Sequence, residues 1–193
     1  MIGSLVIEEI AAEFACLAPE VQLYLEETTG IYDPRSSQAD IVIYPAFKPL
    51  ADSTLVARQF LISSYALVAH PDVLAGKPAL VHPQDLAGFN CLALGEGTLN
   101  GVWELTNEQQ ISRFYFKPAF IATQPTALLH AARQGMGIAS LPGLLIQDDL
   151  QQGKLVPVLP HWQPVPVTFF ALHPGNKVIT VAARRFLDLL LAR

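Results

Sequence analysis

Residues 123–160 contain the clearest succession of secondary-structure signals in the chain, TQPTALLHAARQGMGIASLPGLLIQDDLQQGKLVPVLP. Pro125 predicts the start of a helix, because proline at the first helical position loses only an N–H that would lack a partner there. Gly135 predicts the end of that helix, since glycine readily adopts the left-handed conformation of a helix cap. Small residues that recur at helical spacing predict a face suited to close packing: Leu128, Ala131, Ala132 and Gly135.

The second half of this stretch predicts two strands around a short helix. The apolar run at 137–142 is typical of a strand buried on both faces, as in a parallel sheet. Residues 144–150 predict a short helix that ends at Gly153. Residues 155–159 then predict an edge strand, because the edge of a sheet tolerates Pro157.

The composition indicates a folded chain of one large domain or two small lobes. Its 193 residues can bury a sizeable core, and a content of 51% hydrophobic against 15% charged residues excludes disorder. No apolar run reaches the roughly 18 residues of a transmembrane helix, and the acidic N-terminal segment does not resemble a signal peptide. Cys16 and Cys91 form no motif and are interpreted as buried or half-buried thiols in a reducing compartment. We therefore expect a cytoplasmic protein.

The distribution of charge argues against nucleic-acid binding by these residues. The net charge is −5, and residues 1–40 carry eight acidic groups against a single basic one, Arg35. Such a surface repels the phosphate backbone of a nucleic acid. If the protein regulates DNA, we expect its DNA-binding part to lie outside this chain.

Apolar periodicity predicts an amphipathic helix over residues 5–18. Its buried face is expected to comprise Val6, Ile7, Ile10, Phe14 and Leu17. A second stripe lies on the far side and comprises Leu5, Ala12 and Cys16. Two interpretations of this stripe remain open: ordinary exposed small residues, or a subunit contact, since a helix that is apolar on two sides usually meets two partners.

The rest of the chain alternates predicted strands and helices. Strands are expected at 21–27, at 41–43 with a stop at Tyr44-Pro45, at 58–69 in two segments around Ser63-Ser64, and at 91–94, 113–116, 119–122 and 165–172. Helices are expected at 83–86 and at 180–191, the latter capped by Thr180. This alternation predicts an α/β fold whose sheet is wound on both faces.

The sequence shows no convincing catalytic or metal-binding motif, so we predict no catalytic residue, metal ligand or cofactor. The five histidines are dispersed and are interpreted as surface or helix-capping residues. Gly95-Glu96-Gly97 lacks the third glycine and the lysine of a phosphate-binding loop. Asp148 and Asp149 are interpreted as the solvated face of a short helix.

A ligand-binding site is better supported than a catalytic one. In an open α/β sheet, ligands bind outside the carboxyl ends of strands, beside helix N-termini whose N–H groups attract anions. The rule gives a short list of positions: Gly3-Ser4, Thr28-Thr29, Tyr44, Thr98 and Thr123-Gln124. They suit a small organic anion or a neutral polar molecule. Other roles stay open, because Ser4 and Gln124 can act as helix caps, Tyr44 as a core residue and Thr123 as an ordinary strand residue.

Several motifs occur in an order that resembles a known family. The run G-x-G-I-A-x-L-P at 135–142 is followed by D-D-L-x-x-G-x-L-V at 148–156. Upstream segments agree with the same family: ADIVI at 39–43, STLVAR at 53–58, LVAHP at 67–71 and PQDLAG at 83–88. Over nearly its whole length, the chain resembles the effector-binding domain of the LysR-type transcriptional regulators of bacteria.

The resemblance implies a type 2 periplasmic-binding-protein fold, in which two Rossmann-like lobes are joined by two crossover strands. Lobe one would comprise residues 1–68 plus 169–193, and lobe two residues 69–168. The first strand that the family has in lobe one would be truncated or absent here. The effector would lie in the cleft between the lobes. Its contacts, as the resemblance implies, would be six residues: Ser4, Thr29, Tyr44, Thr98, Thr123 and Gln124. In the family, DNA is bound by an N-terminal winged helix-turn-helix domain, which this chain lacks.

The resemblance also implies a homodimer or tetramer, in which residues 5–18 of one subunit meet residues 126–135 of another. Such a protein senses a small metabolite and catalyses no reaction. Two other interpretations remain. A solute-binding protein of a transporter has the same fold but would need an export signal. A small-molecule enzyme on this fold would need a titratable pair in the cleft.

Overall fold

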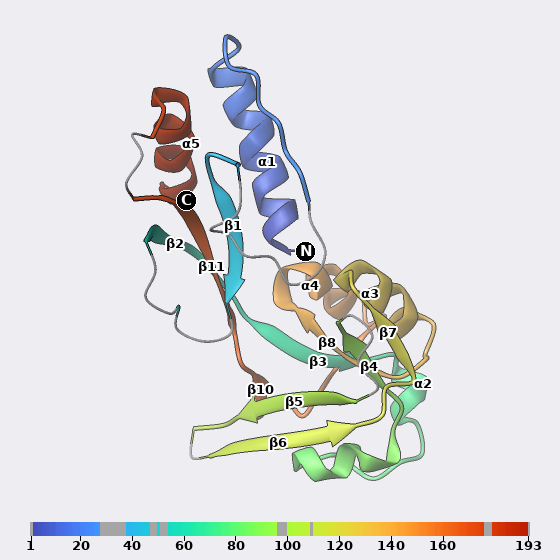
Figure 1. The fold of residues 1–193 in the computed structure, drawn as a ribbon. Helices are drawn as coiled ribbons and strands as arrows, with labels where there is room; N and C mark the ends of the chain where they lie inside the picture. Colours follow the sequence, from blue (N-terminus) through green and yellow to red (C-terminus); the bar gives the residue numbers. More distant parts are fainter. Residues whose placement is uncertain are drawn as a thin grey trace. The chain divides into compact units, whose positions relative to one another are not determined.

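The computed structural model describes residues 2–27, 38–46, 50, 54–95, 100–108, 110–175 and 179–192. The chain divides into two compact units, which are described separately (Figure 1). Unit 1 spans Ser63–Pro166, and unit 2 combines Ile2–Ile62 with Val167–Arg193. The lobe boundaries expected from the sequence, at 68/69 and 168/169, stay a prediction.

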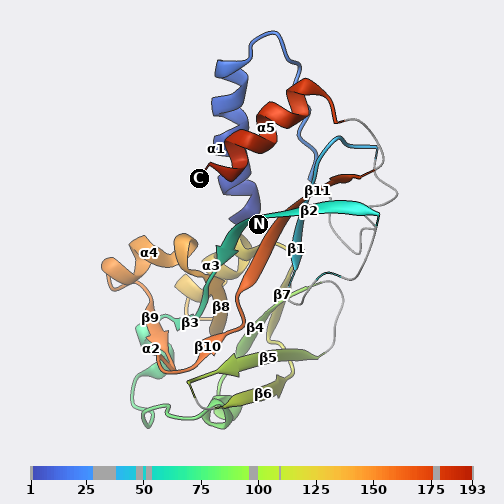
Figure 2. The same ribbon diagram turned by 90° about the vertical axis from the view of Figure 1, so that its left-hand side faces the viewer.

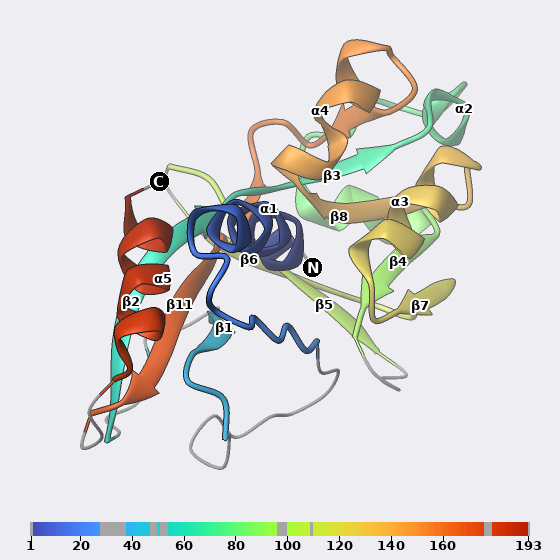
Figure 3. The same ribbon diagram turned by 90° about the horizontal axis from the view of Figure 1, so that it is seen from above.

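Unit 1 is built on a mixed sheet with the strand order β7-β4-β8-β3-β9. The central strands β4 and β8 are parallel to each other, and β7 is parallel to β4. The strand β3 is antiparallel to both of its neighbours, β8 and β9. Figure 3 shows β3, β8, β4 and β7 side by side in this order. The strands are β3 (Tyr65–Ala69), β4 (Cys91–Leu94), β7 (Phe120–Ala122), β8 (Ile138–Pro142) and β9 (Val156–Val158).

Two apolar clusters cover the two faces of this sheet, because alternate residues of each strand point to opposite faces. One cluster joins strand residues such as Ala139 to the helices α3 (Pro125–Arg133) and α4 (Gly143–Gln151). The other joins Ile138 to aromatic residues of a small antiparallel sheet with the order β10-β5-β6. This second side comprises β5 (Gly101–Thr106), β6 (Ile111–Phe116), β10 (Gln163–Pro164), the 3-10 helix η2 (Pro83–Gly88) and the short helix α2 (Pro71–Leu74).

The fold of residues 123–160 agrees with the pattern read from the sequence. The helix α3 begins at Pro125, and Gly135 has the expected left-handed φ of +72°. The strand β8 is almost entirely buried, and β9 is an edge strand that contains Pro157. The small residues Ala131 and Ala132 pack against their own sheet. They are therefore not available for the subunit contact that the sequence suggested for this face.

The buried aspartate of α4 contradicts the sequence interpretation. Asp148 is exposed, as expected, but Asp149 is only 1% exposed. Its carboxylate is bound by the guanidinium of Arg133, which compensates for the loss of water around the charge. The sequence analysis treated the two neighbours alike because it could not show that a basic side chain of α3 reaches one of them.

Unit 2 has a sheet of order β1-β11-β2 packed against two helices. The strand β1 runs antiparallel to β11. Figure 2 shows α1 and α5 side by side, and the rings of Phe14 and Phe186 meet edge to face with centroids 5.3 Å apart. The elements are α1 (Ile2–Leu17), β1 (Val42–Ala46), β2 (Leu55–Ser63), β11 (Val167–Pro174) and α5 (Val181–Leu191).

The first helix differs from its prediction at both ends. It begins at Ile2 and not at residue 5, and Leu17, expected on the buried face, is 59% exposed. The helix ends at Leu17, and the next residue, Ala18, is completely buried in its place. Ala12 and Cys16 are exposed, so the interpretation of Cys16 as a buried or half-buried thiol is wrong, whereas that of Cys91 is confirmed.

Two predicted strands of unit 2 are wrong in part or in whole. Residues 21–27 form no strand, and Leu23, Tyr24 and Leu25 are exposed. Alternation shows that a segment could form a strand, but a strand also needs a neighbour to accept its hydrogen bonds. The strand predicted at 41–43 does not stop at Tyr44-Pro45 but continues to Ala46, because β1 lies at a sheet edge, where proline is tolerated.

Two of the five histidines cap helices, as the sequence analysis allowed. His70 accepts a hydrogen bond from the Asp72 N–H at 3.3 Å, and His82 accepts one from the Gln84 N–H at 3.3 Å. The helix α5 is capped by Thr180 as predicted, through a 3.1 Å bond from the Ala183 N–H. In the described ranges, no helix is long and apolar enough to cross a membrane.

Candidate functional site

Three parallel strands of unit 1 end at one edge of the sheet. These strands are β7, β4 and β8, and their last residues are Ala122, Leu94 and Pro142. We call this edge the carboxyl edge of unit 1. The helix α3 begins soon after β7, and α4 begins directly after β8. Parallel pairing therefore brings the starts of both helices to the edge at which ligands bind in α/β sheets.

The start of α3 has one backbone N–H group, that of Thr126, with no acceptor among the described residues. The side chain of Gln124, the residue before the helix, makes no capping hydrogen bond, and Pro125 has no N–H. The Ala127 N–H donates to the Gln124 carbonyl at 3.1 Å, but no described residue accepts a hydrogen bond from the Thr126 N–H. A helix start with a free N–H group attracts an anion or a polar oxygen.

The start of α4 is already satisfied by the protein. The Gly143 N–H donates to the Ser64 carbonyl at 2.9 Å. Ser64 immediately precedes β3, whose first residue, Tyr65, pairs with Pro142. This contact brings the beginning of β3 to the carboxyl edge of unit 1, beside the ends of β8 and β4.

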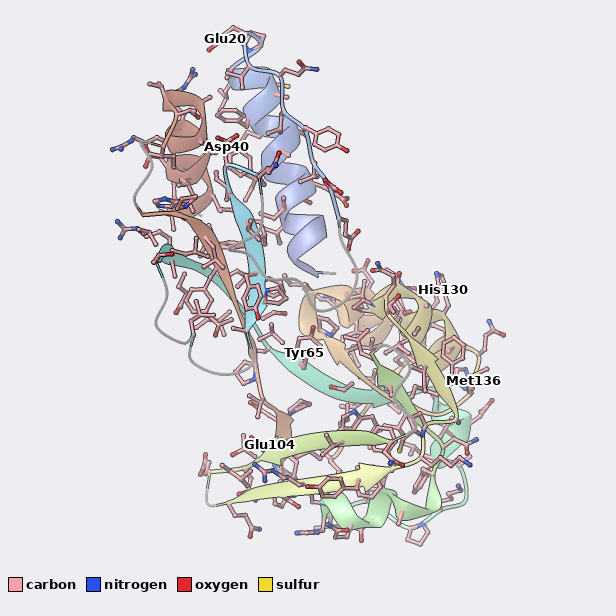
Figure 4. The ribbon with its side chains drawn as sticks, viewed as in Figure 1. Glu20, Asp40, Tyr65, Glu104, His130 and Met136 are labelled. Atoms are coloured by element: carbon pink, nitrogen blue, oxygen red, sulfur yellow. The ribbon has the colours of Figure 1, made fainter. Side chains whose placement is uncertain are left out.

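Tyr65 is a candidate that the sequence analysis missed (Figure 4). Its side chain is half-buried, and this burial raises the pKa of the phenol, which therefore stays neutral. The Tyr65 hydroxyl forms no hydrogen bond with any residue that the structure describes. Because β3 is antiparallel to β8, its first residue lies at the carboxyl edge. Only strand pairing shows this, so the sequence carried no signal for Tyr65.

The structure brings together two of the six residues predicted from the sequence. Thr123 is exposed and Gln124 half-buried, and both lie between β7 and α3, at the carboxyl edge of unit 1. The reading of Gln124 as a side-chain helix cap is wrong, since its side chain makes no such bond. Thr98 lies outside the described residues.

The other predicted residues belong to unit 2. Ser4 lies inside the first turn of α1 and not before the helix as expected. Tyr44 lies in the middle of β1, opposite Phe170, and is half-buried. It does not follow a strand, because β1 continues beyond it. Thr29 lies outside the described residues. The six-residue site as a whole stays a prediction.

The chemistry of the carboxyl edge of unit 1 suits binding. Among the described residues, its polar groups include hydroxyls, an amide and a backbone N–H, and none of these is a strong acid, base or nucleophile near neutral pH. Within the described ranges, no group of three His, Cys, Asp or Glu residues could hold a metal ion. Such an arrangement can orient a small polar molecule by hydrogen bonds.

The comparisons with known proteins agree on one family. The family model described as the LysR substrate binding domain matches residues 1–193. The transcriptional regulator PtxR of Pseudomonas aeruginosa is 27% identical over 184 residues, which are 94% of this chain and 58% of PtxR. The transcriptional regulator CrgA of Neisseria meningitidis serogroup C is 30% identical over 94% of this chain and 60% of CrgA. Both of these relatives are regulators of transcription.

Solved structures show the same fold. The structure of CrgA, a LysR-type transcriptional regulator, matches with a TM-score of 0.79 and 27% identity over 97% of this chain and 63% of CrgA. A full-length AphB variant matches with a TM-score of 0.84 and 25% identity over 97% of this chain and 63% of AphB. The type 2 periplasmic-binding-like fold expected from the sequence is confirmed. The chain spans about three fifths of the length of the relatives that it matches.

Proposed function

Since the chain belongs to the family of LysR substrate-binding domains, we propose that it senses a small polar metabolite at the carboxyl edge of unit 1. It is the effector-binding domain of a LysR-type regulator, and the domain itself is confirmed by the family match. The observation that carries the proposed site is the start of α3, where the Thr126 N–H has no acceptor among the described residues. We propose Ser4, Thr29, Tyr44 and Thr98 as further contacts.

The proposed effector is a small organic anion or a neutral polar molecule. A helix start and the Thr123 hydroxyl can hold a carboxylate or a carbonyl oxygen. The neutral phenol of Tyr65 can donate one further hydrogen bond at the same edge. A ligand acts as a signal only if it binds one conformation of the protein better than another.

The proposed output is a change in DNA binding by a longer protein. The acidic chain described here is a poor partner for DNA, with a net charge of −5. We propose that a separate winged helix-turn-helix domain binds DNA in the cytoplasm, and that the effector changes its affinity for an operator. Sequencing the gene upstream of the Met1 codon would test this directly. A secretion signal there would instead support the transporter interpretation, which the regulators found by comparison do not favour.

We also propose that the whole protein is a homodimer or tetramer. The stripe of α1 that includes Ala12 and Cys16 is exposed and can pack against another subunit. The exposed side of α3, which includes Thr126 and His130, is its proposed partner (Figure 4). We propose no catalytic role for the chain, and its relatives are regulators.

A ligand screen tests the proposed site. Small carboxylic acids and neutral polar metabolites would be added singly, and the thermal unfolding midpoint measured. A true effector is expected to raise the midpoint, because a ligand that binds only the folded state stabilises it. Thr123→Ala and Gln124→Ala should reduce that rise, whereas Gln147→Ala, an exposed position of α4, should not. An effector whose shift is unchanged in both Thr123→Ala and Gln124→Ala would contradict the site.

A further inference from the structure

Asp149 occupies a position that the stability of its own helix does not explain. Among the described residues, it is the one charged residue that is buried, with its side chain 2% exposed. It lies in the last turn of α4, where the negative end of the helix dipole disfavours a carboxylate. Burial and the helix dipole both act against the Asp149 charge. The benefit of this residue must therefore come from its partner.

The partner of Asp149 is Arg133, in the last turn of α3. The Arg133 Nε donates to Oδ1 at 2.8 Å, and its Nη2 donates to Oδ2 at 2.7 Å. A two-pronged contact between guanidinium and carboxylate fixes orientation as well as distance. The same bond raises the pKa of Arg133, so its guanidinium stays protonated. The pair therefore joins the C-terminal ends of α3 and α4.

The two helices that this pair joins both begin at the carboxyl edge of unit 1. They pack on one face of the sheet through Leu128, Ala132 and Ile146, in one apolar cluster. In Figure 3, α3 lies beside β8 and β4, and α4 lies nearer to β3 and β8. Apolar contacts resist separation of a helix from the sheet but resist sliding and rotation less, because they are not directional. A directional bond at one end of two short helices fixes the placement of their other ends.

We propose that Arg133 and Asp149 form a positioning pair, which holds the start of α3 in register with α4 so that its free N–H can bind the effector. This inference rests on the proposed function of the carboxyl edge of unit 1. Neither side chain touches the ligand. Their role is to set the position of the Thr126 N–H, more than ten ångströms away along a helix of 9 residues that rises about 1.5 Å per residue.

The energetics of buried ion pairs provide a sharp test. Removing one partner leaves an uncompensated buried charge, whereas replacing both by apolar residues of similar volume is often neutral for stability. Arg133→Met and Asp149→Leu, each made alone, should therefore lower the urea unfolding midpoint. The double variant that combines them should have the wild-type midpoint. The directional bond is still missing in the double variant. The double variant thus separates the effect of the pair on stability from its effect on the position of α3.

The experiment uses the ¹⁵N-labelled chain, with sodium sulfate as the anion probe. In the wild type, sulfate is expected to shift the amide resonances of Thr126 and Ala127. In the double variant, sulfate binding should be about tenfold weaker, the loss expected for one hydrogen bond to an anion. The matched control is Glu104→Leu with Arg113→Met, which removes an exposed 2.7 Å ion pair of the β5–β6 hairpin. This control should keep the wild-type affinity for sulfate.

Amide exchange provides a readout that does not depend on the probe. The Leu128 and Leu129 amides should exchange about tenfold faster in the double variant, because the first turns of α3 open more often. If the double variant had the stability, the sulfate affinity and the amide exchange rates of the wild type, the positioning role would be overturned. If the α3 amide resonances of the wild type do not shift with sulfate, the anion site is contradicted. The amide exchange rates then decide whether the pair positions α3. If the double variant does not fold, Asp149→Asn, which keeps the volume but breaks the two-pronged contact, replaces it. As a single substitution it should lower the urea unfolding midpoint, and weaker sulfate binding and faster amide exchange are expected as for the double variant.

Discussion

The two cysteines differ in burial and therefore in the expected reactivity of their thiols. Cys91 lies in β4, among Leu67, Ile138 and Leu86, and burial raises the pKa of its thiol to about 12. Cys16 is exposed on α1. Since the thiolate is the reactive form, Cys91 should be inert while the protein is folded.

We predict that Cys91 reacts with a thiol reagent only after unfolding. At pH 8, a thiol with a pKa of about 12 is ionised to the order of 1 part in 10⁴, and the surrounding side chains also block access. The measurement is labelling of a Cys16→Ser variant, in which Cys91 is the remaining thiol, with and without denaturant. Rapid labelling of the native variant would show that the interior of unit 1 is open to solvent.

Gly137 is required by a close approach of two backbone segments. A Cβ at this position would clash with the Asn90 carbonyl oxygen and lie 2.9 Å from the Asn90 carbonyl carbon. The same carbonyl accepts a 2.8 Å hydrogen bond from the Ile138 N–H. The glycine therefore allows β8 to begin directly beside the residue that precedes β4.

We predict that Gly137→Ala destabilises the chain by about 1–3 kcal/mol, the usual cost of forcing an extra methyl group into a packed site. Because the obstacle is backbone, it cannot move aside as a flexible side chain could. Urea unfolding measures the effect. Gly88→Ala is the matched control, because a Cβ there would meet nothing within 4 Å. Equal stability of the two variants would show that the segments can separate without cost.

At the scale of elements, local sequence predicted helix starts where a capping residue or proline marks them, as at α3 and α5, but not the ends of α1. The helix α5 is an example, since Thr180 adopts the extended conformation of a cap and its hydroxyl accepts from the Ala183 N–H. The same helix packs Phe186 and Leu187 against α1 and the sheet of unit 2. A cap and an apolar face are both encoded within a few residues, so no tertiary information is needed to find them.

We predict that Thr180→Ala destabilises unit 2 by about 1 kcal/mol, because an N–H in the first turn of α5 loses its acceptor. Circular dichroism during urea unfolding measures the change. Thr180→Ser retains the hydroxyl and should behave as the wild type. If Thr180→Ser lost as much stability as Thr180→Ala, the methyl group and not the hydrogen bond would be the stabilising feature.

The β5–β6 hairpin is an element that the sequence analysis found only in part. Residues 113–116 were expected to be a strand, and β6 confirms this. The strand β5 was not expected, although Trp103 and Leu105 alternate there with exposed or half-buried residues. Trp103 pairs with Phe114, and Gly101 leaves room for the ring of Phe116. These contacts between strands stabilise the hairpin, and they cannot be read from either strand alone.

At the scale of the whole molecule, the exposed stripe of α1 bears on assembly. Ala12 and Cys16 face solvent, whereas Ile10 and Phe14 are buried in unit 2. The interpretation of this stripe as a subunit contact therefore remains a prediction, and it agrees with the exposure of Ala12 and Cys16. The contact on α3 must use the exposed side of that helix, because Ala131 and Ala132 are buried.

We predict that Ala12→Arg yields a folded monomer, since a long charged side chain cannot be buried without a partner in a close helix contact. Light scattering at several concentrations measures the mass. Ala57→Arg, at an exposed position of β2, is the matched control and should leave the assembly unchanged. An unchanged dimer in Ala12→Arg would exclude α1 from the interface.

The sequence by itself determined the family, the α/β class and most element types. Apolar periodicity, Pro125, Gly135 and Thr180 act within a few residues, so these features need no knowledge of distant segments. For the same reason Thr123 and Gln124 could be placed at a strand end beside a helix start.

Only the tertiary structure decided which distant segments meet. Strand pairing brought Tyr65 to the carboxyl edge of unit 1 and left residues 21–27 outside the strands. The packing of α3 and α4 in one apolar cluster placed Arg133 against Asp149. Each of these outcomes depends on hydrogen bonds or charges between residues far apart in the chain. A local pattern can show that a residue is able to make such a contact, but it cannot supply the partner.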